Sequence, residues 1–404
     1  MASISFYCPD RHIEYDGLTP DGYGIGGGIT SRIRLGASLA SRGHAVTSIV
    51  NCRQPRVIDG VRYLPLDTAE QIEADLLIAN TSGGDMDLSP IGGLRVQART
   101  KVLWVSGVAE PNGLEELAPD ALCAKSNFLL HEITSNWSNQ TASRVVIYNG
   151  YVKQHFEVRA SSVEKDLHAV AYTSHPEKGL DQAVRVVREL RSEGTSHRLF
   201  VLGTEALWGQ DVMPRTAEDG IDYGGMVPQS EVAQLLLAAN FSFCLQSIRE
   251  GFGLTLLESL RAGCCVIASS VGAYPELIEH GVNGILIDKP HQSDEANQQA
   301  KDWIRRLTTD HQRRQCIQRA ARSVPWSWDL IAQAWEQVFL EQGTQPGESA
   351  RTLHPSSSSC RTCRGPLRRF IDGERCLSCG EFDGKGSQQE PDSSALQLSG
   401  GYVA

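Results

Sequence analysis

Two glutamates with seven residues between them lie in one glycine-rich stretch, Glu250 in the turn "REGFG" and Glu258 in the apolar run "LTLLESL". The apolar run predicts a helix that begins near Leu254, whose first backbone N–H groups lack partners and attract anions, phosphates especially. Gly251 and Gly253 have no side chain that would block a ligand's approach. A carboxylate repels phosphate, but it accepts hydrogen bonds from hydroxyl groups attached to the phosphate.

The layout of the two glutamates suits one class of ligand. Glu258 is about one helical turn beyond Leu254, so its carboxylate would accept hydroxyls on the side of the phosphate opposite to Glu250. A nucleoside-diphosphate sugar has this order of groups, since a diphosphate joins its sugar to its ribose. The spacing alone favours an exposed Glu258 and a helix-capping Glu250, because glutamates so spaced are common. Apolar residues on both sides of Glu258 favour burial instead, and a buried carboxylate needs partners.

Four cysteines near the end of the sequence are grouped as C-x2-C-x12-C-x2-C. This spacing is typical of a tetrahedral site built from two zinc knuckles. It predicts a structural zinc ion, because protein thiolates fill all four positions. So short a segment buries little surface, and metal binding would supply its folding energy. The expected zinc ligands are Cys360, Cys363, Cys376 and Cys379.

Two features of the predicted ribbon leave its role open. The other seven cysteines are scattered, several in apolar runs such as "FSFCLQ", which is typical of reduced core thiols in a cytosolic protein. A pair of disulfides among the four grouped cysteines is therefore disfavoured. Five arginines and two acidic residues contribute +3 and a four-thiolate zinc centre −2, so the net charge is +1. That charge is weak support for nucleic-acid binding. A docking or oligomerisation role fits the ribbon at least as well.

Composition narrows the class of protein. A chain of 404 residues predicts two or three domains, and its formal net charge of −10 argues against a general polyanion binder. No apolar run approaches the length of about 20 residues that a membrane span needs. The first residues, "MASISFYCPDRH", lack the basic and apolar segments of a secretory signal, so we expect a cytoplasmic location.

Short apolar strands, each followed by glycine or polar residues, alternate with helical segments along most of the sequence. The alternation is typical of parallel sheets and predicts an α/β fold with two doubly wound, Rossmann-like domains facing a cleft. Ligands of such folds lie beyond the carboxyl ends of the strands. The expected units are an N-terminal domain over 1–150, a C-terminal domain over 151–341, a flexible linker over 342–359, a zinc ribbon over 360–380 and a disordered tail over 381–404.

Several motifs follow one another between residues 3 and 340. They are "GGGITSRIRLGASLASRGHAV", "VIYNGYV", "GGMVPQSEVAQLLLAAN" and "REGFGLTLLESLRAGCCVIASSVGAYPELIEHGVNGILI". In this order they resemble the retaining nucleotide-sugar glycosyltransferases of the GT-B fold, in the sucrose-synthase and mannosyltransferase-like family. The resemblance implies that the first domain faces the acceptor and the second binds the nucleotide sugar. It also implies a hexosyltransferase-class activity without a catalytic metal, since GT-B enzymes generally need none.

The resemblance implies roles for individual residues by position. Glu250 would bind hydroxyls of the donor sugar, and Glu258 those of the ribose. Lys178, in "TSHPEKGL", would neutralise the diphosphate, although a lone lysine at a helix start is usually only solvated. Glu250 and Lys178 are therefore the expected catalytic residues. The other expected donor contacts are Gly26, Gly27, Gly28, His175, Gly251, Phe252, Gly253 and Leu254.

Two positions depart from the family pattern. Many relatives place an arginine five residues before the lysine, where this sequence has Thr173. His175 would compensate only in part, because a neutral imidazole is a weak phosphate partner. Many relatives also carry a histidine near the transferred sugar, where Ser106 stands here. Glu276, in the "PEL" segment, is interpreted as structural.

The leading hypothesis is a retaining glycosyltransferase that uses a nucleotide-diphosphate sugar and an unidentified acceptor. Lys178 and the helix N-terminus would stabilise the charge of the departing diphosphate. One alternative is a non-catalytic GT-B protein that binds a partner through its cleft and ribbon, which Thr173 and Ser106 leave open. Another is a transferase that its ribbon recruits to nucleic acid. The sequence names neither the donor base, nor the sugar, nor the acceptor.

Overall fold

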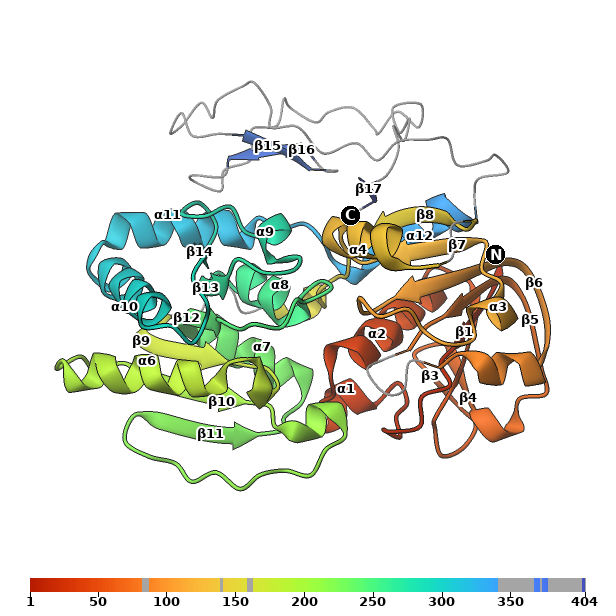
Figure 1. Cartoon of the computed structure of the whole chain (residues 1–404), viewed down its shortest axis with the longest axis horizontal. Helices are drawn as coiled ribbons and strands as arrows, with labels where there is room; N and C mark the ends of the chain where they lie inside the picture. Colours follow the sequence, from red (N-terminus) through yellow and green to blue (C-terminus); the bar gives the residue numbers. More distant parts are fainter. Residues whose placement is uncertain are drawn as a thin grey trace.

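The computed structural model describes residues 1–81, 87–138, 141–157 and 163–340, with the backbone of β15 (Leu367–Phe370), β16 (Gly373–Cys376) and β17 (Tyr402–Val403). Two α/β units lie side by side, each built on its own sheet (Figure 1). β15 and β16 pair as an antiparallel hairpin. Cys360, Cys363 and Cys379 lie outside the described residues, and Cys376 ends β16. The zinc site, the linker and the tail therefore stay predictions.

The first sheet is parallel apart from one hairpin. Its strand order is β17-β8-β7-β6-β5-β1-β2-β4-β3. Its strands are β1 (Ser3–Tyr7), β2 (Ala45–Val50), β3 (Arg56–Ile58), β4 (Val61–Pro65), β5 (Gln71–Ala79), β6 (Arg95–Val105), β7 (Ala121–Ala124), β8 (Ser143–Ile147) and β17. The hairpin of β3 and β4 was missing from the sequence-based expectation. Its turn is Asp59-Gly60, with φ values of 49° and 77°, and Asp-Gly is a strong hairpin signal.

The second sheet is entirely parallel, as expected. Its order is β11-β10-β9-β12-β13-β14. Its strands are β9 (Asp166–Tyr172), β10 (Arg198–Leu202), β11 (Ile221–Gly225), β12 (Ala239–Cys244), β13 (Cys265–Ser269) and β14 (Ile285–Ile287). Every residue of β12 and β13 is buried, because helices cover both faces of the sheet.

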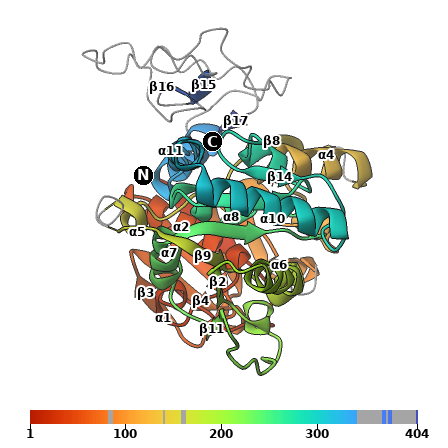
Figure 2. The ribbon, with the colours of Figure 1, turned by 90° about the vertical axis from the view of Figure 1, so that its left-hand side faces the viewer.

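Helices cover both sheets. Those before the second sheet are α1 (Thr19–Gly22), α2 (Gly27–Ser41), α3 (Leu114–Leu117), α4 (Asn127–Asn136) and α5 (Lys153–Glu157). Those after its first strand are α6 (Leu180–Ser192), α7 (Gln229–Ala238), α8 (Leu254–Arg261), α9 (Tyr274–Leu277), α10 (Asp294–Thr309), α11 (His311–Arg322) and α12 (Trp328–Phe339). α6 and α10 pack together on one face of the second sheet (Figure 2). Leu236 of α7 and Leu257 of α8 belong to a hydrophobic core that continues into the first unit.

The last described helix returns to the first unit. The expected boundary at residue 341 placed α12 in the C-terminal domain, whereas the structure packs it against α2. Trp335, fully buried, meets Trp104 of β6 edge-on, with 5.5 Å between ring centroids. Glu336 pairs with Arg42 at 2.5 Å and with His44 at 2.8 Å. The amphipathic pattern predicted the helix itself, but not which unit its apolar face would cover.

Two expectations from composition concern bilayers and thiols. Among the described helices, none has the length and apolar character needed to cross a bilayer. The scattered cysteines are free thiols, as expected. Six are buried and Cys316 is partly exposed.

Candidate active site

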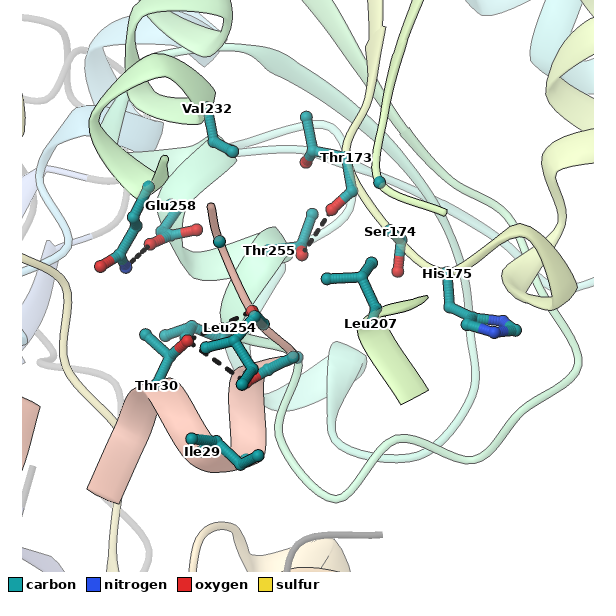
Figure 3. Close-up of a pocket in the computed structure, with 18 of the residues that line it drawn as sticks. Ile29, Thr30, Thr173, Ser174, His175, Leu207, Val232, Leu254, Thr255 and Glu258 are labelled. Atoms are coloured by element: carbon teal, nitrogen blue, oxygen red, sulfur yellow. Dashed lines mark hydrogen bonds between the residues drawn. The ribbon is translucent and has the colours of Figure 1, made fainter. Parts of the chain in front are cut away.

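A cleft of about 270 Å³ separates the two units and receives residues from both. Figure 3 shows part of its wall, where Thr30 of α2 lies near Leu254 of α8. All the donor residues expected from sequence line it. They are Gly26, Gly27, Gly28, His175, Lys178, Glu250, Gly251, Phe252, Gly253, Leu254 and Glu258. The structure thus brings together residues that lie more than 200 positions apart in the sequence.

The turn before α8 is shaped by close packing. Gly253 is the N-cap of α8 with a φ of 95°, and a Cβ there would lie 2.5 Å from Cε1 of Tyr274, so only glycine fits. Phe252 is buried, with its ring centroid 5.5 Å from that of Tyr148. Ser126 Oγ donates to the carbonyl of Gly251 at 2.6 Å. The first unit therefore helps to hold the turn that presents the helix N-terminus to the cleft.

The glycine loop before α2 presses against the second unit. A Cβ at Gly26, the N-cap of α2, would lie 2.6 Å from the carbonyl oxygen of Leu207. A Cβ at Gly24, where φ is 79°, would lie 2.2 Å from the carbonyl oxygen of Val227. The absence of side chains lets the N-terminus of α2 approach that of α8. Both helix ends can then offer unpaired N–H groups to one anionic ligand.

Lys178 and Glu250 form an ion pair across the cleft wall. Their side chains keep 20% and 17% of their accessible surface, so a ligand can reach both groups. Lys178 ends a 3-10 turn, Pro176–Lys178, and its ammonium lies 5.6 Å from the ring centroid of Trp208. Gly179 follows with a φ of 90°, and a Cβ there would lie 2.0 Å from the carbonyl oxygen of Leu245, so the turn requires glycine. The expected cation and the expected carboxylate are thus adjacent, each partly neutralising the other.

His175 lines the cleft, but its ring nitrogens already have partners. Its Nδ1 accepts from the backbone N–H of Glu177 at 3.2 Å, and its Nε2 lies 3.1 Å from Oε1 of Gln210. The ring stacks on Trp208 with 3.6 Å between centroids, and in Figure 3 it points away from Glu258. Burial lowers its pKa. In this arrangement both ring nitrogens of His175 bond within its own unit, and its contact with a phosphate stays a prediction.

Glu258 is buried as expected, with 6% of its surface exposed. Its Oε1 accepts from Nε2 of Gln229 at 2.6 Å, and Gln229 accepts from Nε of Arg34 at 2.9 Å. Arg34 in turn pairs with Asp21 at 2.5 Å. Burial raises the pKa of Glu258 to about 7, against opposing effects of Gln229 and Arg34. The carboxylate thus lies at the end of a polar chain that runs from the first unit into the second.

Glu276 has the structural role expected for it. Its carboxylate accepts from the backbone N–H of Asn127 at 2.9 Å and of Phe128 at 2.5 Å. These N–H groups belong to the first turn of α4, which has no intrahelical partners for them. Tyr148 also donates to Glu276, at 2.9 Å. The carboxylate therefore caps a helix of the first unit and does not enter the cleft.

The cleft also contains three residues of the first unit for which the sequence predicted no ligand contact. They are Ser106, Lys125 and Asn149. Ser106 was noted as standing in place of a histidine common in the family, and Asn149 only inside a motif. Lys125 was read as part of the strand "ALCAKS", although a lysine in so apolar a run is itself a signal. The structure places Lys125 just beyond β7 with 4% of its surface exposed. Oδ1 of Asn149 is buried without a hydrogen-bond partner among the described residues.

A catalytic metal was not expected, and this stays a prediction. The described residues contain no group of three or more acidic, histidine or cysteine side chains that would hold a metal ion. The sequence does contain one Asp-x-Asp triplet at Asp85 and Asp87. Asp85 lies outside the described residues, and Oδ1 of Asp87 accepts from the backbone N–H of Ser89 at 2.9 Å.

With this geometry in place, comparison with known proteins defines the class. Residues 154–323 match the family model described as "Glycosyl transferases group 1". A curated relative, an uncharacterized glycosyltransferase of Methanocaldococcus jannaschii, is 22% identical over 226 residues, which are 55% of this chain and 60% of that protein. The match thus spans less than two thirds of the relative. The residues of the second unit are thus similar to group 1 glycosyltransferases.

Solved structures extend the similarity to the whole described fold. Sucrose-phosphate synthase from Thermosynechococcus elongatus superposes with a TM-score of 0.61 at 16% identity, over 84% of this chain and 98% of that one. Anabaena HepE, solved in complex with UDP and glucose, gives 0.59 at 16% identity, over 85% and 100%. The chain therefore has the two-domain GT-B fold of these glycosyltransferases.

Proposed function

We propose that this protein is a retaining glycosyltransferase that moves a sugar from a nucleoside-diphosphate sugar to an acceptor. One observation carries the proposal. Glu250 and Glu258 lie on either side of the α8 N-terminus, in a cleft that the α2 N-terminus also enters. Two carboxylates with anion-binding N–H groups between them suit a diphosphate that joins two hydroxyl-rich groups.

Glu258 would bind the ribose. One of its oxygens accepts from Gln229, and the residue is buried with 6% of its surface exposed. Ribose hydroxyls donate hydrogen bonds to the ionised carboxylate, so their binding favours that form. Burial of Glu258 thereby links ribose binding to the loss of a proton from this carboxyl.

Lys178 and Glu250 would exchange partners when the donor binds. Without ligand, the ammonium and the carboxylate neutralise each other. A diphosphate carries more negative charge than the Glu250 carboxylate and would replace it as the partner of the ammonium. The hydroxyls of the donor sugar would then donate hydrogen bonds to Glu250. The ion pair therefore holds both side chains at the cleft wall before the substrate arrives, and lowers the entropy lost on binding.

The proposed reaction takes place on one face of the sugar. The bond from the anomeric carbon to the diphosphate oxygen breaks, the bond to the acceptor oxygen forms on the same face, and the acceptor proton passes to the departing oxygen. The leaving group itself is then the base. Lys178 and the two helix N-termini stabilise the charge that develops on the diphosphate.

Ligand-dependent melting tests the proposal. UDP is the first probe, because HepE was solved with it, and GDP and ADP follow. A ligand that binds the folded state raises Tm, and Glu258→Ala should abolish the rise. A chain whose Tm responds to none of the three, or a nucleotide sugar that is bound but never hydrolysed or transferred, would contradict an enzyme of this class. The second outcome would favour a binding protein.

A further inference from the structure

Lys125 is a buried cation on the acceptor side of the cleft. It follows β7, and neighbouring β6 leads to Ser106, so parallel strands bring the two residues to one sheet edge. Nζ of Lys125 donates to Oγ of Ser106 at 3.0 Å and lies 4.5 Å from the ring centroid of Trp104. With 4% of its surface exposed, the lysine has little contact with solvent beyond the cleft.

The surroundings of Lys125 lack a compensating anion. Burial, with a smaller effect from Arg32, a second buried cation, lowers the pKa of Lys125 to about 7. Nε of Arg32 donates to Asn80 at 2.8 Å, while its two terminal nitrogens have no hydrogen-bond partner among the described residues. No carboxylate of the described residues forms an ion pair with either cation. Buried cations are costly without an anionic partner.

The hydrogen bond between Lys125 and Ser106 determines whether a ligand group at this point must donate or accept hydrogen bonds. Because Oγ of Ser106 accepts from the ammonium, the hydroxyl proton is available to a ligand. The ammonium has two further N–H donors. Both side chains line the cleft, so at this point they present donors. A group that only accepts, such as a carboxylate or a phosphate, matches such a pair better than a hydroxyl does.

The pair lies beside the turn that carries Glu250. A Cβ on Gly251 would lie 3.1 Å from the carbonyl oxygen of Ser106, and Ser126, the residue after Lys125, bonds to the carbonyl of Gly251. Under the proposed function, this turn contacts the transferred sugar. The donors of Lys125 and Ser106 therefore lie at the reacting end of the cleft, away from Glu258 and the ribose.

We propose that Lys125 and Ser106 bind a carboxylate or phosphate group at the reacting end of the cleft. The anionic group belongs either to the transferred sugar, as in a uronic acid, or to the acceptor. This inference rests on the proposed function, since that function places the sugar beside Glu250. It makes the substrate an acidic one, which the family match does not specify.

Two pairs of probes separate the sources. The donor arm compares the affinities of UDP-glucuronic acid and UDP-glucose by calorimetry. The acceptor arm compares glucose 6-phosphate with glucose in protein saturated with UDP. We expect wild type to prefer the anionic member of one pair, and Lys125→Met to reduce that preference about 10- to 100-fold, as for a lost hydrogen bond between charged groups. Lys153→Met, at a half-exposed lysine paired with Glu157, is the matched control and should keep the preference.

A second variant, Ser106→Ala, tests the same site. Ser106→Ala removes one donor without a buried charge and should reduce the preference several-fold, so it serves if Lys125→Met fails to fold. UDP affinity should be unchanged in Lys153→Met, because Lys153 does not line the cleft. The proposal is wrong if wild type binds UDP but prefers neither anionic probe, or if Lys125→Met keeps the preference. A wild type that binds no nucleoside diphosphate overturns the proposed function and this inference together.

Discussion

The buried carboxylate of Glu258 should make the protein less stable at alkaline pH, and Glu258→Gln should remove this effect. The folded-state pKa is raised from 4.5 to about 7, so the stabilising contribution is fully present below pH 4.5 and is lost as pH rises through 7. At about 1.36 kcal/mol per pKa unit, the loss amounts to about 3 kcal/mol. Glutamine has the same shape, keeps an oxygen that can accept from Gln229, and does not ionise.

Urea unfolding of wild type and Glu258→Gln between pH 5 and 8.5 measures the effect. The free energies of unfolding should be similar at the acid end, and the variant should exceed wild type by about 2–3 kcal/mol at the alkaline end. The difference between the two proteins removes the titration of every other group. Glu231→Gln, at an exposed glutamate of α7, should show no such trend. A difference that does not change with pH would refute the idea of a desolvated, titrating Glu258.

The same substitution should weaken nucleoside-diphosphate binding, because an amide replaces the proposed ribose acceptor. Stability would rise while function falls, as is common where an active site holds an unfavourable charge. Enough ligand should reverse the alkaline loss in wild type, since ribose hydroxyls stabilise the ionised form. Glu258→Gln should gain less from the same ligand concentration.

Three further variants test the remaining roles. Glu250→Ala should lower kcat more than it raises KM for the donor, since its hydroxyl contact is proposed to strengthen in the transition state; an unchanged kcat would contradict this. Lys178→Ala should weaken nucleoside-diphosphate binding by about 1.5–3 kcal/mol but leave nucleoside binding nearly unchanged, and equal losses for both ligands would indicate misfolding instead. Cys360→Ser should reduce the zinc content from about one ion per chain to near zero while donor hydrolysis persists; wild type purified in reductant without chelator that holds no zinc would refute the ribbon.

The local motifs predicted the part of the site that local geometry determines. Glu258 could be predicted as buried because its helix is apolar on both sides. The left-handed conformation of Gly253 could not, because it depends on the close approach of Tyr274. Lys178 and Glu250 were expected in one site, but not as an ion pair. Their contact depends on how the turn at Gly179 packs against β12, which sequence spacing does not encode.

Distant contacts account for what the sequence did not predict. The partners of the His175 ring, Gln210 and Trp208, lie more than 30 positions away in the sequence, and no local motif predicted them. Lys125 was missed because its neighbours predict a strand, and only the sheet order places it beside Ser106. α12 was assigned to the wrong unit because an amphipathic helix shows that it has an apolar face, not which surface that face covers.

The return of α12 makes the second unit an insertion within the first. The chain leaves the first unit after Asn149 and returns to it before Trp328. Backbone hydrogen bonds join these two connecting segments. Tyr151 N–H donates to Trp326 at 2.9 Å, and Trp328 N–H donates to the carbonyl of Tyr151 at 3.1 Å. A mechanical force applied between the beginning of β1 and the end of α12 would therefore act first on the first unit and on these two hydrogen bonds. It would reach the second unit only after the hydrogen bonds had broken. In a pulling experiment, the second unit should be the later of the two to unfold.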